Sequence, residues 1–68
     1  MNTYKVIFSN NLPAYAVKLN VAYNEIIRLH KKNGKTYIKW FIVNCENKKE
    51  ALDISEKVVK AIWASVLE

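Results

Sequence analysis

Basic side chains with aromatic neighbours form the part of this 68-residue sequence that could do chemistry. The segment from residue 26 to residue 45 has no acid and five bases, which are Arg28, Lys31, Lys32, Lys35 and Lys39. Bases and acids are equal in number in the rest of the chain, so this segment accounts for the whole formal net charge of +5. Cationic side chains bind phosphate, and aromatic rings between them can stack on nucleobases. The segment is therefore a candidate site for nucleic acid.

Two sets of candidate residues follow from this segment and the C-terminal region. The nucleic-acid set is Arg28, His30, Lys31, Lys32, Lys35, Tyr37, Lys39, Phe41, Lys48 and Lys49. His30 is included because an imidazole beside lysines could contact phosphate or respond to pH. The alternative is a solvated turn whose flanking rings contact another protein chain. That alternative gives a protein-interface set: Tyr37, Phe41, Val59, Trp63 and Val66.

An Asn33-Gly34 pair inside the basic segment predicts a β-hairpin with a type I′ turn. The strand pairs that follow from this turn are Lys32–Lys35, Leu29–Ile38 and Ile27–Trp40. One face of the hairpin is then an apolar core face with Ile27, Leu29, Ile38, Trp40 and Ile42. The other face is mixed, basic and aromatic, with Ile26, Arg28, His30, Tyr37, Lys39, Phe41 and Val43.

The segment from residue 15 to residue 31 has two interpretations. Most of its apolar residues fall at odd positions, which predicts a strand that bends near Asn24 and Glu25. Some of its residues also fit helical spacing, with Pro13 near the start and Gly34 just beyond the end. We prefer the strand, and the alternative is a β-α-β-α order in which residues 13–32 are helical.

The two ends of the sequence have clearer patterns. Residues 3–9 alternate in hydropathy and are rich in β-formers, which predicts a strand. Asn47 predicts a helix start, because its side chain can accept a hydrogen bond from the backbone N–H of Glu50. Apolar residues at helical spacing follow from Ala51 onwards. We expect a single α+β domain over residues 1–68, with a three-stranded antiparallel meander and one C-terminal helix packed on one face.

The run Asn47-Lys48-Lys49-Glu50-Ala51 resembles the start of the last helix of double-stranded RNA-binding domains. Lys48 and Lys49 match the two leading lysines of that family's Lys-Lys-x-Ala-Lys run, and Leu52 stands where the family has the third lysine. Three strands followed by such a helix also look like the latter part of that fold. The resemblance implies that Lys48 and Lys49 grip phosphates across a major groove.

Residues for catalysis or metal binding are not grouped in this sequence. Four acids (Glu46, Glu50, Asp53 and Glu56) cluster at the expected helix start, where the helix dipole favours negative charge. Cys45 is the single cysteine, and we expect it to be buried and unreactive. We therefore predict a non-enzyme that uses no cofactor, no metal and no small-molecule substrate.

A cytoplasmic location without membrane contact is the expectation. The N-terminal residues lack the charged start and apolar run of a signal peptide. No apolar stretch approaches the ~20 residues that span a bilayer. A single cysteine also fits a reducing compartment.

The sequence leads to two hypotheses for function. The first is a small interaction protein, forming a homodimer, that binds or modulates another protein. Compact chains of this Lys- and Asn-rich type are common among phage and mobile-element accessory proteins. The alternative is a nucleic-acid-binding module that uses the basic hairpin, residues 28–39.

Overall fold

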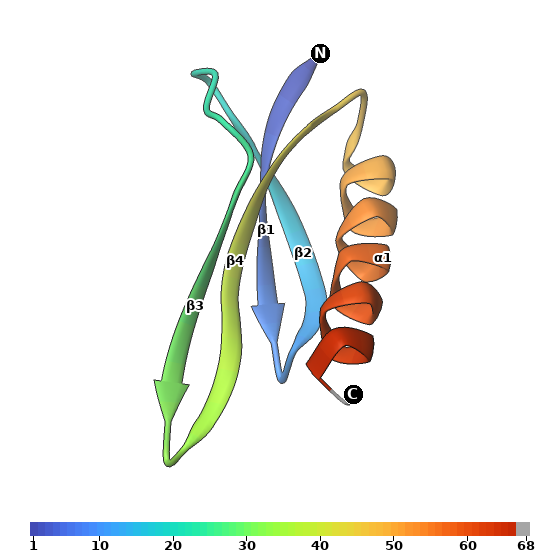
Figure 1. Cartoon of the computed structure of the whole chain (residues 1–68). Coiled ribbons are helices and arrows are strands. Elements are labelled where there is room, and N and C mark those ends of the chain that lie inside the picture. Colours follow the sequence, from blue (N-terminus) through green and yellow to red (C-terminus); the bar gives the residue numbers. More distant parts are fainter. Residues whose placement is uncertain (67–68) are drawn as a thin grey trace.

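Within residues 1–66, four antiparallel strands form one sheet, and a single helix covers one of its faces (Figure 1). The computed structural model describes residues 1–66, with side chains for residues 1–64. The elements are β1 (Asn2–Ser9), β2 (Leu12–Leu19), β3 (Ile26–Lys32), β4 (Lys35–Cys45) and α1 (Lys48–Val66). The strand order is β2-β1-β4-β3, so the first and last strands are central. The α+β class and the C-terminal helix are confirmed, but the sheet has four strands rather than three and is not a meander.

The first hairpin joins β1 to β2 through Asn10 and Asn11. Both residues have the left-handed backbone, with φ of 52° and 63°, which asparagine tolerates better than most residues. Pro13 lies in β2 beside a shift of register between Ile7 and Phe8. Proline is acceptable there because β2 is an edge strand, where a missing N–H breaks no pairing with a further strand.

The second hairpin confirms the predicted turn. Asn33 and Gly34 both have positive φ, 53° and 77°. Two of the three expected pairs, Lys32–Lys35 and Leu29–Ile38, are present. The predicted Ile27–Trp40 pair is wrong, because a β-bulge shifts the register between Arg28 and Leu29. Lys39 is the extra residue of the bulge, and Ile27 pairs with Phe41 instead.

The segment from residue 15 to residue 31 is neither one bent strand nor a helix over residues 13–32. It is parts of β2 and β3, which lie at opposite edges of the sheet and are joined by residues 20–25. Hydrogen bonds from Asn44 hold this link: its backbone N–H donates to Glu25 Oε2 at 3.1 Å, and its Nδ2 donates to the Tyr23 carbonyl at 3.2 Å. Both segments are strands, and the alternation of apolar residues continues through the link between them. The pattern therefore does not reveal that the strand is interrupted there.

The core lies between α1 and the strands β2, β1 and β4. Its buried members are Tyr4, Val6, Ala16, Phe41, Val43, Cys45 and Ala51. Asn47 begins the helix as predicted, since its Oδ1 accepts the backbone N–H of Glu50 at 2.8 Å. Within residues 1–66, no helix has the length and hydropathy needed to cross a bilayer.

The bulge at Lys39 reverses which face the upper part of β4 presents to the helix. Phe41 and Val43 belong to the core on the α1 side, whereas the sequence placed them on the opposite face. Trp40 and Ile42, which were expected in the core, consequently lie on the face away from α1. An extra residue in a strand turns every later side chain to the other side, because side chains alternate with a period of two.

Candidate functional site

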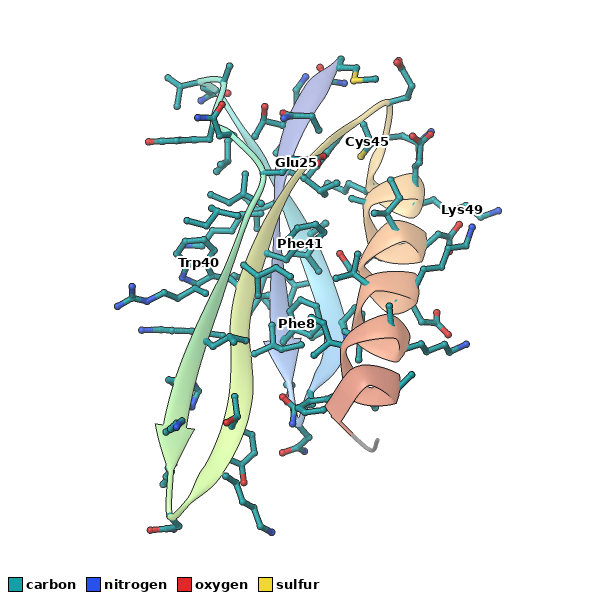
Figure 2. The ribbon with its side chains drawn as sticks, in the orientation of Figure 1. Phe8, Glu25, Trp40, Phe41, Cys45 and Lys49 are labelled. Atoms are coloured by element: carbon teal, nitrogen blue, oxygen red, sulfur yellow. The ribbon has the colours of Figure 1, made fainter. Side chains whose placement is uncertain are left out.

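The sheet face that α1 leaves uncovered, here called the open face, is the candidate site. Residues that pair directly across two strands lie on the same face of a sheet. Trp40 points away from α1 (Figure 2), and its partners are Arg28 on β3 and Ile7 on β1. The pairs that extend from these residues give the centre of the open face: Lys5, Ile7, Tyr15, Val17, Ile26, Arg28, Trp40 and Ile42.

Cationic residues neighbour Trp40 on both adjacent strands. The Lys5 Nζ lies 5.0 Å from the ring centroid, within the range of a cation–π contact. Arg28 comes from the strand on the other side of β4 and pairs directly with Trp40. Among the described residues, no strand position holds aspartate or glutamate. The positive charge of the open face is therefore not neutralised by acids of the sheet.

Apolar side chains are exposed between these cations. Tyr15 is 55% exposed, Val17 44% and Ile26 54%. Ile42 lies beside Lys5 and Ile26 in the ladders and is only 7% exposed, although α1 is on the other side of the sheet. An apolar surface that the fold itself leaves uncovered indicates a contact site for another molecule.

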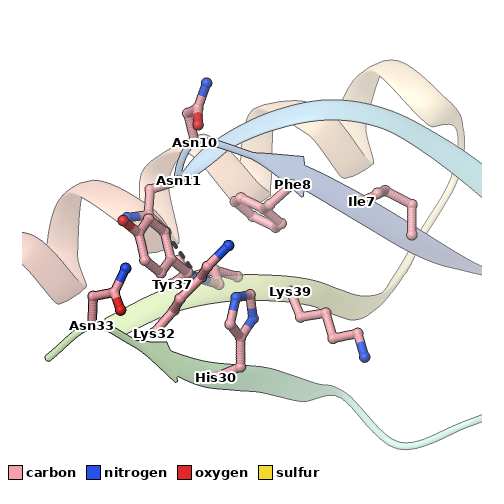
Figure 3. Close-up of a pocket in the computed structure, with 10 residues that line it drawn as sticks. Ile7, Phe8, Asn10, Asn11, His30, Lys32, Asn33, Tyr37 and Lys39 are labelled. Atoms are coloured by element: carbon pink, nitrogen blue, oxygen red, sulfur yellow. Dashed lines mark hydrogen bonds between the residues drawn. The ribbon is translucent and has the colours of Figure 1, made fainter. Parts of the chain in front are cut away.

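A hollow of about 570 Å3 opens between the tips of the two hairpins (Figure 3). We call it the tip hollow. It begins where β1 and β4 part after the Ile7–Trp40 pair. Its lining comes from the end of β1, the β1–β2 turn and the β3–β4 hairpin: Ile7, Phe8, Asn10, Asn11, His30, Lys32, Asn33, Tyr37, Ile38 and Lys39. The His30 and Tyr37 rings stack there, with centroids 5.6 Å apart and planes 22° apart.

Asn11 joins the two hairpins across this gap. Its Oδ1 accepts the backbone N–H of Ile38 at 2.8 Å, and its Nδ2 donates to the Thr36 carbonyl at 3.5 Å. The side-chain amide thus takes the place of a strand along the part of β4 that β1 no longer reaches. Sequence reasoning missed this contact, because it joins residues that are 25 and 27 positions apart.

Five of the ten residues in the nucleic-acid set come together on the open face or at the tip hollow. They are Arg28, His30, Lys32, Tyr37 and Lys39. Lys31 alternates with them and points to the opposite side of β3, whereas Lys35 pairs with Lys32 at the turn on the same face but does not line the tip hollow. Phe41 is buried in the core, so it cannot stack on a base.

Lys48 and Lys49 do not join the basic hairpin. They begin α1, in the other layer of the fold, and Lys49 points away from the sheet (Figure 2). Both are exposed, as is expected for lysines in the first turn of a helix. The phosphate contacts that the resemblance implied would therefore be separate from the open face.

The protein-interface set is dispersed. Phe41 and Val59 are 7% and 5% exposed, so both are occupied by the chain's own core. Trp63 is half-buried, and Tyr37 is half-buried against His30. Val66 has its side chain outside the described residues.

Seven of the eight residues at the centre of the open face, all but Arg28, were missing from both candidate sets, and Lys5 and Trp40 are the two of them that form its cation–π contact. Lys5 alternates with the core residues Tyr4 and Val6, and this pattern alone would have placed it on the opposite face. Trp40 was assigned to the core because no residue pattern marks the bulge. The aromatic centre of the site therefore became visible only in the structure.

Cys45 is confirmed as a buried residue. Its Sγ donates to the Asn47 carbonyl at 3.4 Å. Burial raises the pKa of the Cys45 thiol, and the influence of the Asn47 backbone on the thiolate offsets this only in part. The thiol is therefore protonated at neutral pH, the form that is not nucleophilic. Within residues 1–66, no three His, Cys, Asp or Glu side chains come together as metal ligands.

The open face can therefore hold an anion on several cations and stack flat rings on its own aromatic side chains. Its chemistry is that of a contact surface for a partner rich in negative charge. No protein-family model, curated protein sequence or solved structure matches this chain.

Proposed function

We propose that this protein is a non-catalytic module that binds single-stranded nucleic acid on its open face. The observation that carries the proposal is the arrangement around Trp40, where Lys5 lies over the aromatic ring and Arg28 pairs with Trp40 from the next strand, on a sheet whose described strands hold no acid. Cations attract the phosphates of the backbone, and rings between them stack on the bases.

A single strand fits this surface better than a duplex does. Trp40 on β4 and Tyr15 on β2 lie on either side of the central strand β1, whose Ile7 pairs with both residues, so their rings share one face of the sheet. Such rings can stack only on unpaired bases, because the bases of a duplex are already stacked on one another. Base stacking of this kind tolerates different sequences, so we expect little sequence preference.

The expected salt dependence follows from the number of cations. Four lie on the open face or at the tip hollow: Lys5, Arg28, Lys32 and Lys39. If each meets one phosphate of a single strand, the slope of log K against log salt concentration is about −3, at ~0.7 per phosphate. Affinity should then fall roughly fiftyfold between 50 and 200 mM salt.

Fluorescence anisotropy of a labelled dodecathymidylate tests the proposal. The unmodified protein should bind it at 50 mM salt with the slope just given. Replacing Arg28→Gln should make the slope shallower by about 0.7, because one phosphate contact is lost. Lys57→Gln is the matched control, since Lys57 is exposed on α1 and its loss should leave the slope unchanged. Absence of binding at 50 mM salt, or equal effects of the two variants, would refute the proposal.

A protein partner is the second candidate, because Val17 and Ile26 are aliphatic and exposed on the same face. Contact between two open faces would bring Lys5 and Arg28 of two copies together, and these like charges repel. An acidic partner therefore suits the open face better than a second copy does.

The homodimer expected from the sequence remains a proposal. Light scattering at high micromolar concentration tests it, and a monomer at that concentration would contradict it. A cytoplasmic location likewise remains a proposal, based on the unpaired Cys45.

A further inference from the structure

The tip hollow differs from the rest of the open face because it has an apolar floor and a polar rim. Phe8 and Ile38 belong to the side of the sheet that faces the core, and they line the hollow because β1 and β4 have separated there. Figure 3 shows His30, Lys32 and Lys39 along its β3–β4 side, and the Lys32 side chain reaches towards the turn with Asn10 and Asn11.

We propose that the tip hollow is a site for one phosphorylated nucleotide, and that on a nucleic-acid strand this is the terminal one. The cationic groups of Lys32 and Lys39 would hold the phosphate. The Tyr37 ring and the apolar floor would receive the base, and side-chain amides of the rim offer donors and acceptors to its edge. Binding of the terminal nucleotide of a nucleic-acid strand rests on the proposed function, whereas binding of a free nucleotide does not.

The dimensions of the hollow fit one nucleotide. Its volume of about 570 Å3 lies within the ~300–1,000 Å3 range of small-molecule sites. Its lining contains two lysines and a histidine and, among the described residues, no acid. Lys39 owes its place to the β-bulge, which makes it the extra residue of β4 beside the hollow. Bulges often redirect a side chain in this way next to a functional site.

The boundaries of the hollow favour the terminal nucleotide of a nucleic-acid strand over an internal nucleotide. The last β1–β4 pair, Ile7–Trp40, bounds the gap on one side. The hydrogen bonds of Asn11 to Thr36 and Ile38 bridge the gap on the other side. An internal nucleotide would have to enter with the backbone leaving in both directions. A terminal nucleotide enters with one backbone connection, and its extra phosphate charge is available to the lysines.

The test compares octathymidylates that differ only at their ends. One has hydroxyl groups at both ends, one has a 5′-phosphate and one a 3′-phosphate. We expect one phosphorylated strand to bind about tenfold more tightly than the hydroxyl-ended strand, equivalent to about 1.4 kcal/mol. Lys32→Gln and Lys39→Gln should each reduce this ratio, and the double variant should abolish it. Lys31→Gln is the matched control, because Lys31 is the sequence neighbour of Lys32 and points to the other side of β3.

Free adenosine monophosphate (AMP) is the second probe, and it separates this inference from the proposed function. In a two-dimensional NMR titration, AMP should shift the backbone amide signals of Asn11, Ile38 and Lys39 and leave that of Val17 unchanged. The inference would be overturned by two results together: equal affinity for the three octathymidylates, and no AMP shift at 10 mM, a concentration of the order of weak nucleotide binding. The open face could still bind nucleic-acid strands in that case. AMP shifts without any strand binding would refute the proposed function and keep the hollow as a site for free nucleotides.

Discussion

Loss of the Asn11 side chain should weaken the fold, because this amide replaces a missing strand. The perturbation is Asn11→Gly, which keeps the left-handed backbone at φ 63° accessible and removes only the amide. The variant loses the 2.8 Å bond from the Ile38 N–H and the 3.5 Å bond to the Thr36 carbonyl. Ile38 is 4% exposed, so its N–H would be left with little access to water.

The magnitude follows from these bonds. A buried donor without a partner costs ~1–3 kcal/mol, and the long bond to Thr36 adds little. We therefore expect the free energy of unfolding to fall by about 2 kcal/mol. In a domain of this size, 1 kcal/mol corresponds to a shift of roughly 4–8 °C in Tm, so Tm should fall by roughly 8–16 °C.

Asn10→Gly is the matched control for this prediction. Asn10 is the neighbour of Asn11 in the same turn, has φ of 52°, and its side chain is exposed. Urea denaturation followed by circular dichroism gives the two free energies, and hydrogen exchange reports on the Ile38 amide directly. Exchange at Ile38 should accelerate only in Asn11→Gly. Equal losses of stability in the two variants, within about 0.5 kcal/mol, would show that the turn backbone matters and the amide does not.

Two further predictions concern the start of α1 and the buried thiol. Asn47→Ala should lower the free energy of unfolding by about 1 kcal/mol, because the Glu50 N–H loses its 2.8 Å acceptor; urea denaturation measures this, and Asn47→Asp, which keeps the acceptor, should lose less. Because the pKa of the Cys45 thiol is raised in the folded state, its contribution to the free energy of unfolding is fully present below the pKa of the unfolded thiol. This contribution is lost as the pH rises from there through the pKa of the folded thiol. The stability difference between the unmodified protein and Cys45→Ala should therefore shrink between pH 7 and pH 10. A difference that stays constant over this range would contradict the argument.

The parts of the fold that depend on local chemistry were predictable from the sequence. The Asn33-Gly34 turn and the Asn47 helix start each rest on residues a few positions apart, and both were predicted correctly. The break between β2 and β3 was not predictable in this way. Residues 20–25 contain no glycine or proline to mark it, and their link is held by Asn44, about twenty positions along the chain.

The candidate site was predictable in its charge and not in its geometry. The acid-free segment identified Arg28, Lys32 and Lys39, because charge can be read from composition. The bulge at Lys39 has no local signal, so the sequence placed Phe41 on the wrong face and Trp40 in the core. The tip hollow could not be foreseen at all, since it depends on how far the second hairpin extends beyond the first.

The single sign of charge along the strands also bears on how copies of this protein coexist in solution. β2 and β3 are the two edges of the sheet, and edge strands can add strands from neighbouring molecules. Every charged side chain on these edges is positive: Lys18 on β2, and Arg28, Lys31 and Lys32 on β3. Repulsion between such edges reaches about 10 Å at 0.1 M salt and about 3 Å at 1 M. Concentrated salt should therefore remove the barrier that keeps these molecules from aggregating edge to edge.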